Sequence, residues 1–185
     1  EVVVIGGGVI GVSVAYHLAE AGIQDVVLVE RKELTSGTTW HAAGLVGQLR
    51  SSINMTKLAR YTSELYRGLE SETGQATGYR QCGSMSIAAT AERFEELKRS
   101  ASMAKVFGLE VNVLSVAEIA ERYPLIQTDD LFGGIHIPSA GYANAVDITQ
   151  ALAKGAKGRG VHIATHTKVE EILHEGGQIT GVRTD

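Results

Sequence analysis

The sequence opens with Val2-Val3-Val4-Ile5-Gly6-Gly7-Gly8-Val9-Ile10-Gly11, and this stretch decides the fold. Its first four residues are an apolar, β-branched run, which predicts a strand buried on both faces in a parallel sheet. The glycines follow the spacing G-x-G-x-x-G. A helical pattern comes next, and we expect it to end at Gly22 as the C′ residue. The apolar side of this helix comprises Val12, Ala15, Leu18 and Ala19.

A second apolar run, Val26-Val27-Leu28-Val29, ends in the acidic residue Glu30. Strand, glycine turn, helix, strand and acid in this order form the βαβ unit that holds a dinucleotide. Glu30 stands 30 − 11 = 19 positions after Gly11, where its carboxylate can accept hydrogen bonds from both ribose hydroxyls. It would repel a 2′-phosphate, so the pattern argues against NADP and leaves NAD and FAD open. The alternative interpretation is a glycine-tolerant turn in another βαβ fold.

Each glycine of the turn has a separate physical task. Gly6 permits the tight turn, Gly8 lets a pyrophosphate approach the backbone, and Gly11 lets the helix pack close to the strand. The N–H groups of Val9 and Ile10 begin the helix. We expect them to point at the phosphates, with assistance from the helix dipole.

The composition narrows the class of protein. The 185 residues are 44% hydrophobic and 21% charged, which is ordinary for a soluble globular domain. A formal net charge of −4 gives no reason to expect a nucleic-acid or membrane-surface partner. Cys82 is the only cysteine, so an internal disulfide and a cysteine-based zinc cluster are excluded. No apolar run is long enough to span a bilayer.

The segment Leu34-Thr35-Ser36-Gly37-Thr38-Thr39-Trp40-His41-Ala42-Ala43-Gly44-Leu45 is rich in hydroxyls and small residues. Small residues allow the backbone to lie against a flat ligand, and hydroxyls at a helix start can bind phosphate oxygens. A second interpretation is a Ser/Thr-capped helix that follows a loop. The pattern alone leaves both open.

Together, Gly6-x-Gly8-x-x-Gly11, Glu30-Arg31 and residues 34–45 resemble the FAD-dependent amine oxidoreductases of the D-amino-acid-oxidase superfamily. Within it, the chain is most similar to the dimethylglycine and sarcosine dehydrogenase family. The likeness runs over the whole chain, including Pro138-Ser139-Ala140-Gly141. It implies FAD as the cofactor, and it implies contacts from Gly6, Gly8, Val9, Ile10, Gly11, Glu30, Arg31, Ser36, Gly37, Thr38, Thr39, Trp40, His41, Ala42, Ala43, Gly44, Leu45 and Val169.

In this family the histidine of the T-W-H-A-A-G stretch anchors the flavin covalently at its 8α-methyl carbon, and His41 occupies that place. The chemistry is compatible, because the 8-methyl of oxidised flavin becomes electrophilic after losing a proton and a neutral imidazole can add to it. By resemblance, the backbone of Val169 contacts the adenine ring. The other histidines have no such context, and we assign them no ligand role.

Beyond residue 45 the pattern predicts further helices and strands. Residues 53–72 form an amphipathic helix with a stripe of Leu58, Tyr61, Leu65 and Leu69, and Gly74 and Gly78 interrupt the chain after it. Strands are expected at 84–88 and 111–114, and a helix with a solvated charged face at 91–107. Ser115-x-x-Glu118 is a capping box that opens a helix ending before Pro124.

The pattern also predicts helices and strands in the C-terminal third of the chain. Residues 131–138 predict a strand with a glycine bulge. Asp147 is expected to cap a helix that runs to about Ala156 and ends at Gly155, Gly158 and Gly160. Residues 161–164 predict a buried strand, which in the family adds to the dinucleotide sheet. Residues 168–173 and 179–183 predict a hairpin.

The fold class expected is α/β. The resemblance implies a Rossmann-like FAD-binding domain of the glutathione-reductase type, incomplete, over residues 1–45 and 147–185. Residues 46–146 interrupt it, and we expect them to form part of an inserted, substrate-side α+β layer. The chain ends without a tail, so we expect a fragment truncated at the C-terminus.

The function implied by the resemblance is oxidation of the N-methyl group of a secondary or tertiary amino acid such as sarcosine or dimethylglycine. The electron acceptor would be oxygen or an electron-transfer flavoprotein, and tetrahydrofolate would bind in a missing C-terminal domain. Catalytic residues are expected downstream of Asp185, and no metal is expected. Relatives are cytoplasmic in bacteria and mitochondrial in eukaryotes. A non-catalytic regulatory relative and an NAD-dependent dehydrogenase are the alternatives.

Overall fold

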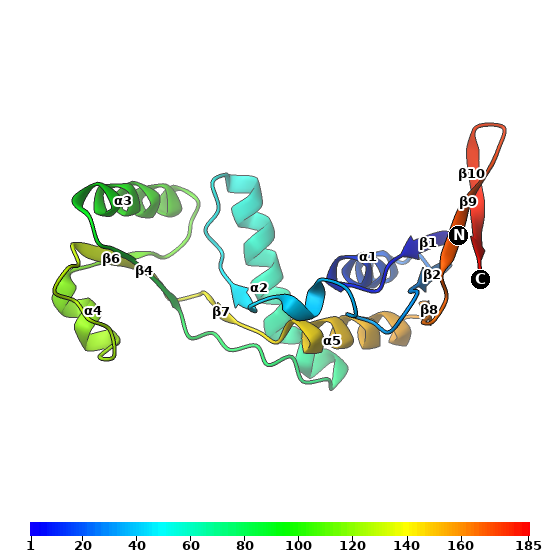
Figure 1. Ribbon diagram of the computed structural model, residues 1–185, viewed down its shortest axis with the longest axis horizontal. Coiled ribbons are helices and arrows are strands. Elements are labelled where there is room, and N and C mark those ends of the chain that lie inside the picture. Colours follow the sequence, from blue (N-terminus) through cyan, green and yellow to red (C-terminus); the bar gives the residue numbers. More distant parts are fainter. The chain divides into compact units, whose positions relative to one another are not determined.

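The computed structural model describes residues 1–185, and the chain separates into two compact units. The first unit contains residues 1–44, 65–79 and 143–185, and the second contains residues 45–64 and 80–142. Residues 65–79, which the sequence analysis places in the inserted layer, therefore lie in the first unit. Figure 1 labels the elements in chain order, and each unit is described by itself below.

The first unit contains the predicted βαβ crossover. Strands β1 (Val2–Ile5), β2 (Val26–Val29) and β8 (His162–Ala164) form a parallel sheet in the order β1-β2-β8. Helix α1 (Val9–Glu20) connects the first two strands. The expected burial of β1 on both faces is wrong, because Ile5 is 52% exposed. The strand lies at the edge of this sheet, whereas β2 has a strand on either side and is largely buried.

Helix α1 ends as the sequence predicts. Gly22 adopts a φ of +86°, and the N–H of Ile23 reaches back to the carbonyl of Leu18 at 3.0 Å. The buried face is shifted from the predicted one. Val12 and Ala15 are buried as expected, but Tyr16 is completely buried while Leu18 and Ala19 are only partly so.

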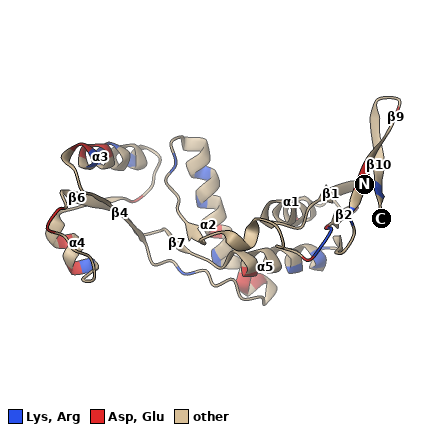
Figure 2. Ribbon diagram, viewed as in Figure 1, with Lys and Arg blue, Asp and Glu red and all other residues tan.

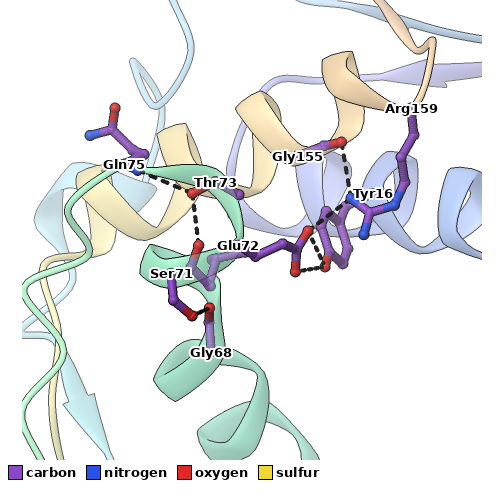
Figure 3. Close-up of polar contacts among 9 residues, drawn as sticks. Tyr16, Gly68, Ser71, Glu72, Thr73, Gln75, Gly155 and Arg159 are labelled. Atoms are coloured by element: carbon purple, nitrogen blue, oxygen red, sulfur yellow. Dashed lines mark hydrogen bonds and ion pairs between the residues drawn. The ribbon is translucent and has the colours of Figure 1, made fainter.

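Tyr16 is buried because two other helices of the unit enclose it (Figure 3). Its hydroxyl donates to the Glu72 carboxylate at 2.8 Å, and Arg159 makes an ion pair with the same carboxylate at 2.9 Å. The Arg159 guanidinium also lies 4.8 Å from the centre of the Tyr16 ring. Burial, followed by the hydrogen bond to Glu72, raises the pKa of Tyr16 to about 12.

Helix α5 (Ala145–Gly158) corrects two expectations. Its N-cap is Asn144, whose side-chain oxygen accepts from the N–H groups of Val146 and Asp147, so Asp147 is not the cap. Gly155 does not end the helix. It lies inside it, where a Cβ would come within 2.7 Å of the Tyr16 ring, and the chain turns only at Gly160 with a φ of +95°.

The chain closes with the predicted hairpin. Strands β9 (Val169–Glu175) and β10 (Gln178–Thr184) pair antiparallel. Gly176 and Gly177 connect them, both with positive φ, as a tight hairpin turn requires.

The second unit is built on an antiparallel sheet of β4 (Ser84–Ala88), β6 (Gly133–Ile137) and β5 (Asn112–Leu114), in the order β4-β6-β5. Ile135 and Ile137 belong to a hydrophobic cluster with Leu97 and Ala101 of α3 (Ala91–Val106). The glycine bulge predicted in β6 is wrong, because its pairing with both neighbours is continuous. A short pair, β3 (Leu45–Val46) with β7 (Gly141–Tyr142), completes the strands of this unit.

Helix α4 (Val116–Arg122) confirms the capping box. The Ser115 hydroxyl accepts from the Glu118 N–H at 3.3 Å, and the Glu118 carboxylate accepts from the Ser115 N–H at 2.8 Å. The Ser115 hydroxyl also donates to this carboxylate at 2.7 Å, and this bond, followed by the one from the Ser115 N–H, lowers the pKa of Glu118. On α3, Figure 2 shows charges of both signs side by side. Arg93 and Glu96 form an ion pair there at 2.6 Å, consistent with the predicted solvated face.

Helix α2 (Ile53–Thr73) has its predicted length but not its predicted buried face. Leu69 is fully buried, yet Leu58 is 57% exposed and Tyr61 is 43% exposed. Thr56 and Ser63 are buried instead, and Ser63 satisfies its hydroxyl by donating to the Ala59 carbonyl at 3.1 Å. No helix combines the length and apolar character needed to cross a membrane.

Candidate cofactor site

A cavity of about 440 Å³ lies at the glycine turn of the first unit. Three separated stretches of sequence meet around it: the start of α1, the end of β2, and the hydroxyl-rich segment that follows. Most of the predicted cofactor residues line this cavity, and their contacts with FAD stay predictions. The lining residues are Gly8, Val9, Ile10, Glu30, Arg31, Lys32, Ser36, Gly37, Thr38, Thr39 and Ala42.

The glycines of the turn have the geometry that a dinucleotide turn requires. Gly6 adopts a φ of +109°, which L side chains rarely tolerate. A Cβ on Gly11 would collide with the Gly6 carbonyl oxygen and lie 3.5 Å from the Val4 side chain, so helix and strand can approach only because it is absent. Gly8 is the N-cap of α1 and presents no side chain to the cavity.

The N-terminus of α1 is suited to binding an anion. The first turn of the helix carries no acidic residue, and the N-cap makes no side-chain hydrogen bond. First-turn N–H groups such as those of Ile10 and Gly11 have no intrahelical acceptor. A pyrophosphate would supply acceptors for them and would be favoured by the helix dipole.

The hydroxyl-rich segment is tied directly to the glycine turn. Thr35 has a φ of +69°, and its N–H donates to the Gly7 carbonyl at 3.0 Å. The Thr39 hydroxyl accepts from the N–H of Val9 at 3.0 Å, and Thr39 is only 8% exposed. A phosphate contact from the Val9 N–H would have to displace this hydroxyl, so that contact stays a prediction. Thr39 can instead donate its own proton into the cavity.

The segment does not form the capped helix that the sequence offered as its second interpretation. It contains only one 3₁₀ turn, η1 (Thr39–His41), and Thr38 makes no side-chain cap. The physical reason lies at Thr35, whose φ of +69° is outside the right-handed helical region, so an α-helix cannot run through this residue.

Glu30 is held at the edge of the cavity by backbone donors. One carboxylate oxygen accepts from the Gly7 N–H at 2.7 Å and the other accepts from the Lys32 N–H at 2.8 Å. Each oxygen keeps further lone-pair capacity, so both can still accept from ribose hydroxyls. Lys32 was missed by the sequence analysis. The only available signal was its place two residues after the acid.

A second cavity, of about 310 Å³, lies beside the first. Ala42 lines both cavities. The second is lined by Trp40, Ala42 and Ala43 from the T-W-H-A-A-G stretch, and by residues 143–146 at the start of α5. Asn144, the N-cap of α5, therefore joins the site, and nothing in the sequence pattern alone places it there.

His41 lines neither cavity. Its side chain is exposed and its ring stacks on Trp40 with centroids 3.7 Å apart. Its chain neighbours, Trp40 and Ala42, both line the second cavity. The structure therefore brings His41 near the second cavity only through its chain neighbours, and its bond to a flavin stays a prediction.

The remaining predicted residues lie further out. Gly44 has a φ of +77°, its carbonyl accepts from the Ala143 N–H at 2.9 Å, and a Cβ there would strike the Ala143 carbonyl oxygen. Leu45 is in the second unit and is 82% exposed. Val169 lines neither cavity, although Thr167, two residues before it, donates its N–H to the Glu30 carbonyl at 2.9 Å.

The donor set and shape fit FAD. A side-chain-free helix mouth, an acid with open lone pairs and a hydroxyl-lined wall suit the adenosine and pyrophosphate parts. Small residues and one aromatic ring in the adjoining cavity suit a flat ring system. No group of three or more His, Cys, Asp or Glu side chains is placed to hold a metal ion.

Comparison with known proteins points the same way. The family model described as FAD dependent oxidoreductase matches residues 1–185. The chain is 44% identical to rat dimethylglycine dehydrogenase over 161 residues, which is 87% of the chain and 19% of that protein. It is 44% identical to human sarcosine dehydrogenase over 173 residues, which is 93% of the chain and 19% of that protein.

The whole chain also matches the mouse pyruvate dehydrogenase phosphatase regulatory subunit, with 42% identity over 185 residues and 21% of that protein covered. The chain therefore spans about a fifth of the length of these relatives. Among solved structures, L-proline dehydrogenase from P. horikoshii has a TM-score of 0.93 and 28% identity. That match covers 100% of this chain and 49% of the other.

Proposed function

The chain belongs to the FAD-dependent oxidoreductase family, and from this premise we propose that the full-length protein oxidises the N-methyl group of a secondary or tertiary amino acid. Sarcosine and dimethylglycine are the substrates we favour. The observation that carries the proposal is the cavity at the glycine turn, because the helix mouth, Glu30 and the hydroxyl-rich segment all line it. The similarity to dimethylglycine and sarcosine dehydrogenases supports the substrate class.

In this proposal the residues of the first unit bind and orient the cofactor. The first-turn N–H groups of α1 and the Thr39 hydroxyl hold the pyrophosphate, and Glu30 holds the ribose. Trp40 and the small residues after it lie against the flavin ring, and His41 ties the flavin to the chain covalently. A bound flavin supplies the redox chemistry, since it accepts a hydride from the N-methyl carbon.

The amine must be unprotonated to react, so the substrate pocket needs a base or a desolvating wall. We place that group, and a tetrahydrofolate site, in sequence beyond Asp185. The electron acceptor we propose is oxygen or an electron-transfer flavoprotein. If the protein is eukaryotic, we propose the mitochondrial matrix as its compartment, because the rat and human relatives are named as mitochondrial. If it is bacterial, we propose the cytoplasm.

The test is anaerobic reduction of the full-length protein. We expect the flavin absorbance near its long-wavelength maximum to bleach on addition of sarcosine or dimethylglycine, and not on addition of glycine as the matched control. A protein that carries flavin but is bleached by neither N-methyl amino acid would contradict the substrate assignment.

A second function is favoured by one specific comparison. The mouse regulatory subunit is 42% identical over the whole chain, so the sequence likeness alone does not separate an enzyme from a regulatory relative. In that case the fold would bind flavin without turning over an amine. The same experiment separates the two functions. A regulatory relative should carry flavin that dithionite reduces and that no amine reduces.

A further inference from the structure

The second unit has a cavity of its own, of about 620 Å³, which shares no residue with the cofactor site. It lies on the α4 face of the sheet, opposite the hydrophobic cluster with α3. Met85 and His136 pair across β4 and β6 on this face, and Ile87 pairs with Gly134. The lining residues are Cys82, Gly83, Ser84, Met85, Ile87, Arg122, Tyr123, Ile126 and His136.

Two side chains that line this cavity, Arg122 and His136, carry polar groups without a partner. Arg122 ends α4 and makes neither an ion pair nor a hydrogen bond in the structure. The acid one turn before it, Glu118, is engaged by the Ser115 N–H and hydroxyl. The Nδ1 atom of His136 is buried and has no hydrogen-bond partner. A buried polar atom without a partner costs free energy, so a site that holds one is suited to a ligand that supplies it.

The imidazole of His136 lies against Gly83 in the turn before β4, where a side chain would leave it no room. Gly83 adopts a φ of +78°, and a Cβ there would collide with the Nε2 atom of His136. Burial, and then the positive charge of Arg122, lower the pKa of His136, so the ring is neutral at pH 7 and can donate or accept one hydrogen bond. Arg122 and His136 both line this cavity.

The remaining lining residues define the ligand's other end. Met85, Ile87 and Ile126 contribute apolar surface, and no carboxylate lines the cavity. A guanidinium without a partner selects a carboxylate by charge and by its two-pronged geometry. A cation is excluded by the same charge. The apolar wall selects a short hydrocarbon substituent over a fully hydrated anion.

We propose that this cavity is a binding site for a small carboxylate with a branched apolar substituent, whose carboxylate pairs with Arg122 and is hydrogen-bonded by His136. The site stands on residues of the second unit alone. It does not depend on flavin binding or on the amine-oxidase activity proposed above.

Cys82 provides a direct probe, because its exposed thiol lines the cavity and is the only cysteine in residues 1–185. The full-length protein is treated with iodoacetamide, and alkylation of the tryptic peptide 81–93 is followed by mass spectrometry. The test ligand is 4-methylpentanoate, and its neutral control is 4-methylpentanamide. We expect the carboxylate to slow alkylation of Cys82 in a saturable way and the amide to leave the rate unchanged.

Two variants sharpen the result. Arg122→Gln removes the guanidinium from an exposed helix end. It should raise about tenfold the concentration of 4-methylpentanoate that protects Cys82 half-maximally. Arg99 is exposed on α3 and lies outside the cavity. In the Arg99→Gln variant the carboxylate should protect Cys82 as well as in the unaltered protein. Equal protection by acid and amide, or protection that survives Arg122→Gln, would overturn the proposal. So would an alkylation rate that the carboxylate does not change. Flavin content and amine-dependent bleaching, read in the same samples, report separately on the proposed function.

Discussion

Two glycine clusters in this chain look alike in sequence but serve opposite purposes. Gly6–Gly11 follows β1 and opens onto a cavity, whereas Gly133 and Gly134 begin β6 and are buried under other residues. A Cβ on Gly133 would lie 2.5 Å from the Phe94 ring, and one on Gly134 would lie 2.6 Å from the Ser86 carbonyl oxygen. In both places a side chain is excluded, but only the first lines a cavity, which we propose as the FAD site.

The comparison shows that a glycine pattern gives the backbone geometry and not the reason for it. The first cluster is identified as a ligand site by what surrounds it, namely a helix mouth, an acid and a hydroxyl-rich segment. The second is identified as packing because α3 and α4 cover it. Substitutions in the two clusters should therefore separate cofactor binding from stability.

The largest effect is expected for Gly11→Ala. The added Cβ meets the Gly6 carbonyl oxygen, which is backbone and cannot rotate away, so α1 must move from the glycine turn. Because a displacement of about 1 Å at a positioned site can cost about a hundredfold, FAD affinity should fall by about that factor. Flavin per mole of purified full-length protein and a titration of the apoprotein with FAD measure it.

The matched control is Gly68→Ala, because Gly68 lies in α2 and a Cβ there meets nothing within 4 Å. It should bind FAD normally. Gly8→Ala provides a milder variant, since its Cβ would meet only the Thr39 hydroxyl at 3.1 Å, and it should fold and bind FAD more weakly. Normal FAD affinity in both Gly11→Ala and Gly8→Ala would contradict the assignment of the site.

The opposite result is expected for Gly134→Ala. Its Cβ would press on the Ser86 carbonyl and the Ile119 side chain, so the second unit should lose about 1–3 kcal/mol of unfolding free energy. FAD affinity of the folded protein should not change. Urea unfolding measures the stability, and titration with FAD measures the affinity. A loss of FAD affinity as large as that of Gly11→Ala would contradict the distinction between the two glycine clusters.

A smaller effect is expected for Thr39→Val, which keeps the shape of the side chain and removes its hydroxyl. The Val9 N–H then loses its acceptor, and the cavity loses a donor, so FAD affinity should fall about tenfold. Thr39→Ser should restore most of it. If valine and serine variants bind FAD alike, the hydroxyl has no part in the site.

The smallest effect concerns the helix clamp at Tyr16. The folded-state pKa of about 12 lies above the ordinary tyrosine value of about 10, so the proton is held more tightly in the folded state. The associated stability is complete below pH 10 and is lost as the pH rises through 12. Tyr16→Phe should flatten the alkaline loss of stability between these pH values, as measured by urea unfolding at a series of pH values. An unchanged profile would contradict the role of the hydroxyl.

Several elements of both units were predictable from sequence because their signals are local. The crossover, the stop at Gly22, the capping box at Ser115 and the hairpin turn each depend on residues within one or two turns of chain. Gly155 was assigned a wrong role because its partner is distant, whereas Asn144 was missed although the N–H groups that it caps are only two and three residues ahead. Gly155 is small to admit Tyr16, which comes from another helix 139 positions earlier, since 155 − 16 = 139.

The buried face of α2 was predicted wrongly for a different reason. Apolar spacing identifies the face of a helix that can be buried. In the structure, however, Thr56 and Ser63 are buried, and Leu58 and Tyr61 are exposed. Likewise, the residues around the glycine turn were predictable from their motif, whereas the cavity beside His136 has no motif. It results from strand register, a helix end and one missing hydrogen-bond partner.

The central claim is that FAD lies along the glycine turn with its flavin end at the Trp40–His41 pair. Tryptic mapping of the denatured full-length protein tests it most directly, since cleavage after Lys32 and Arg50 isolates His41 in the peptide 33–50. We predict that this peptide carries the mass of one FAD less two hydrogen atoms, and that His41→Ala abolishes the adduct. An unmodified 33–50 peptide, with all flavin released on denaturation, would contradict the covalent role of His41.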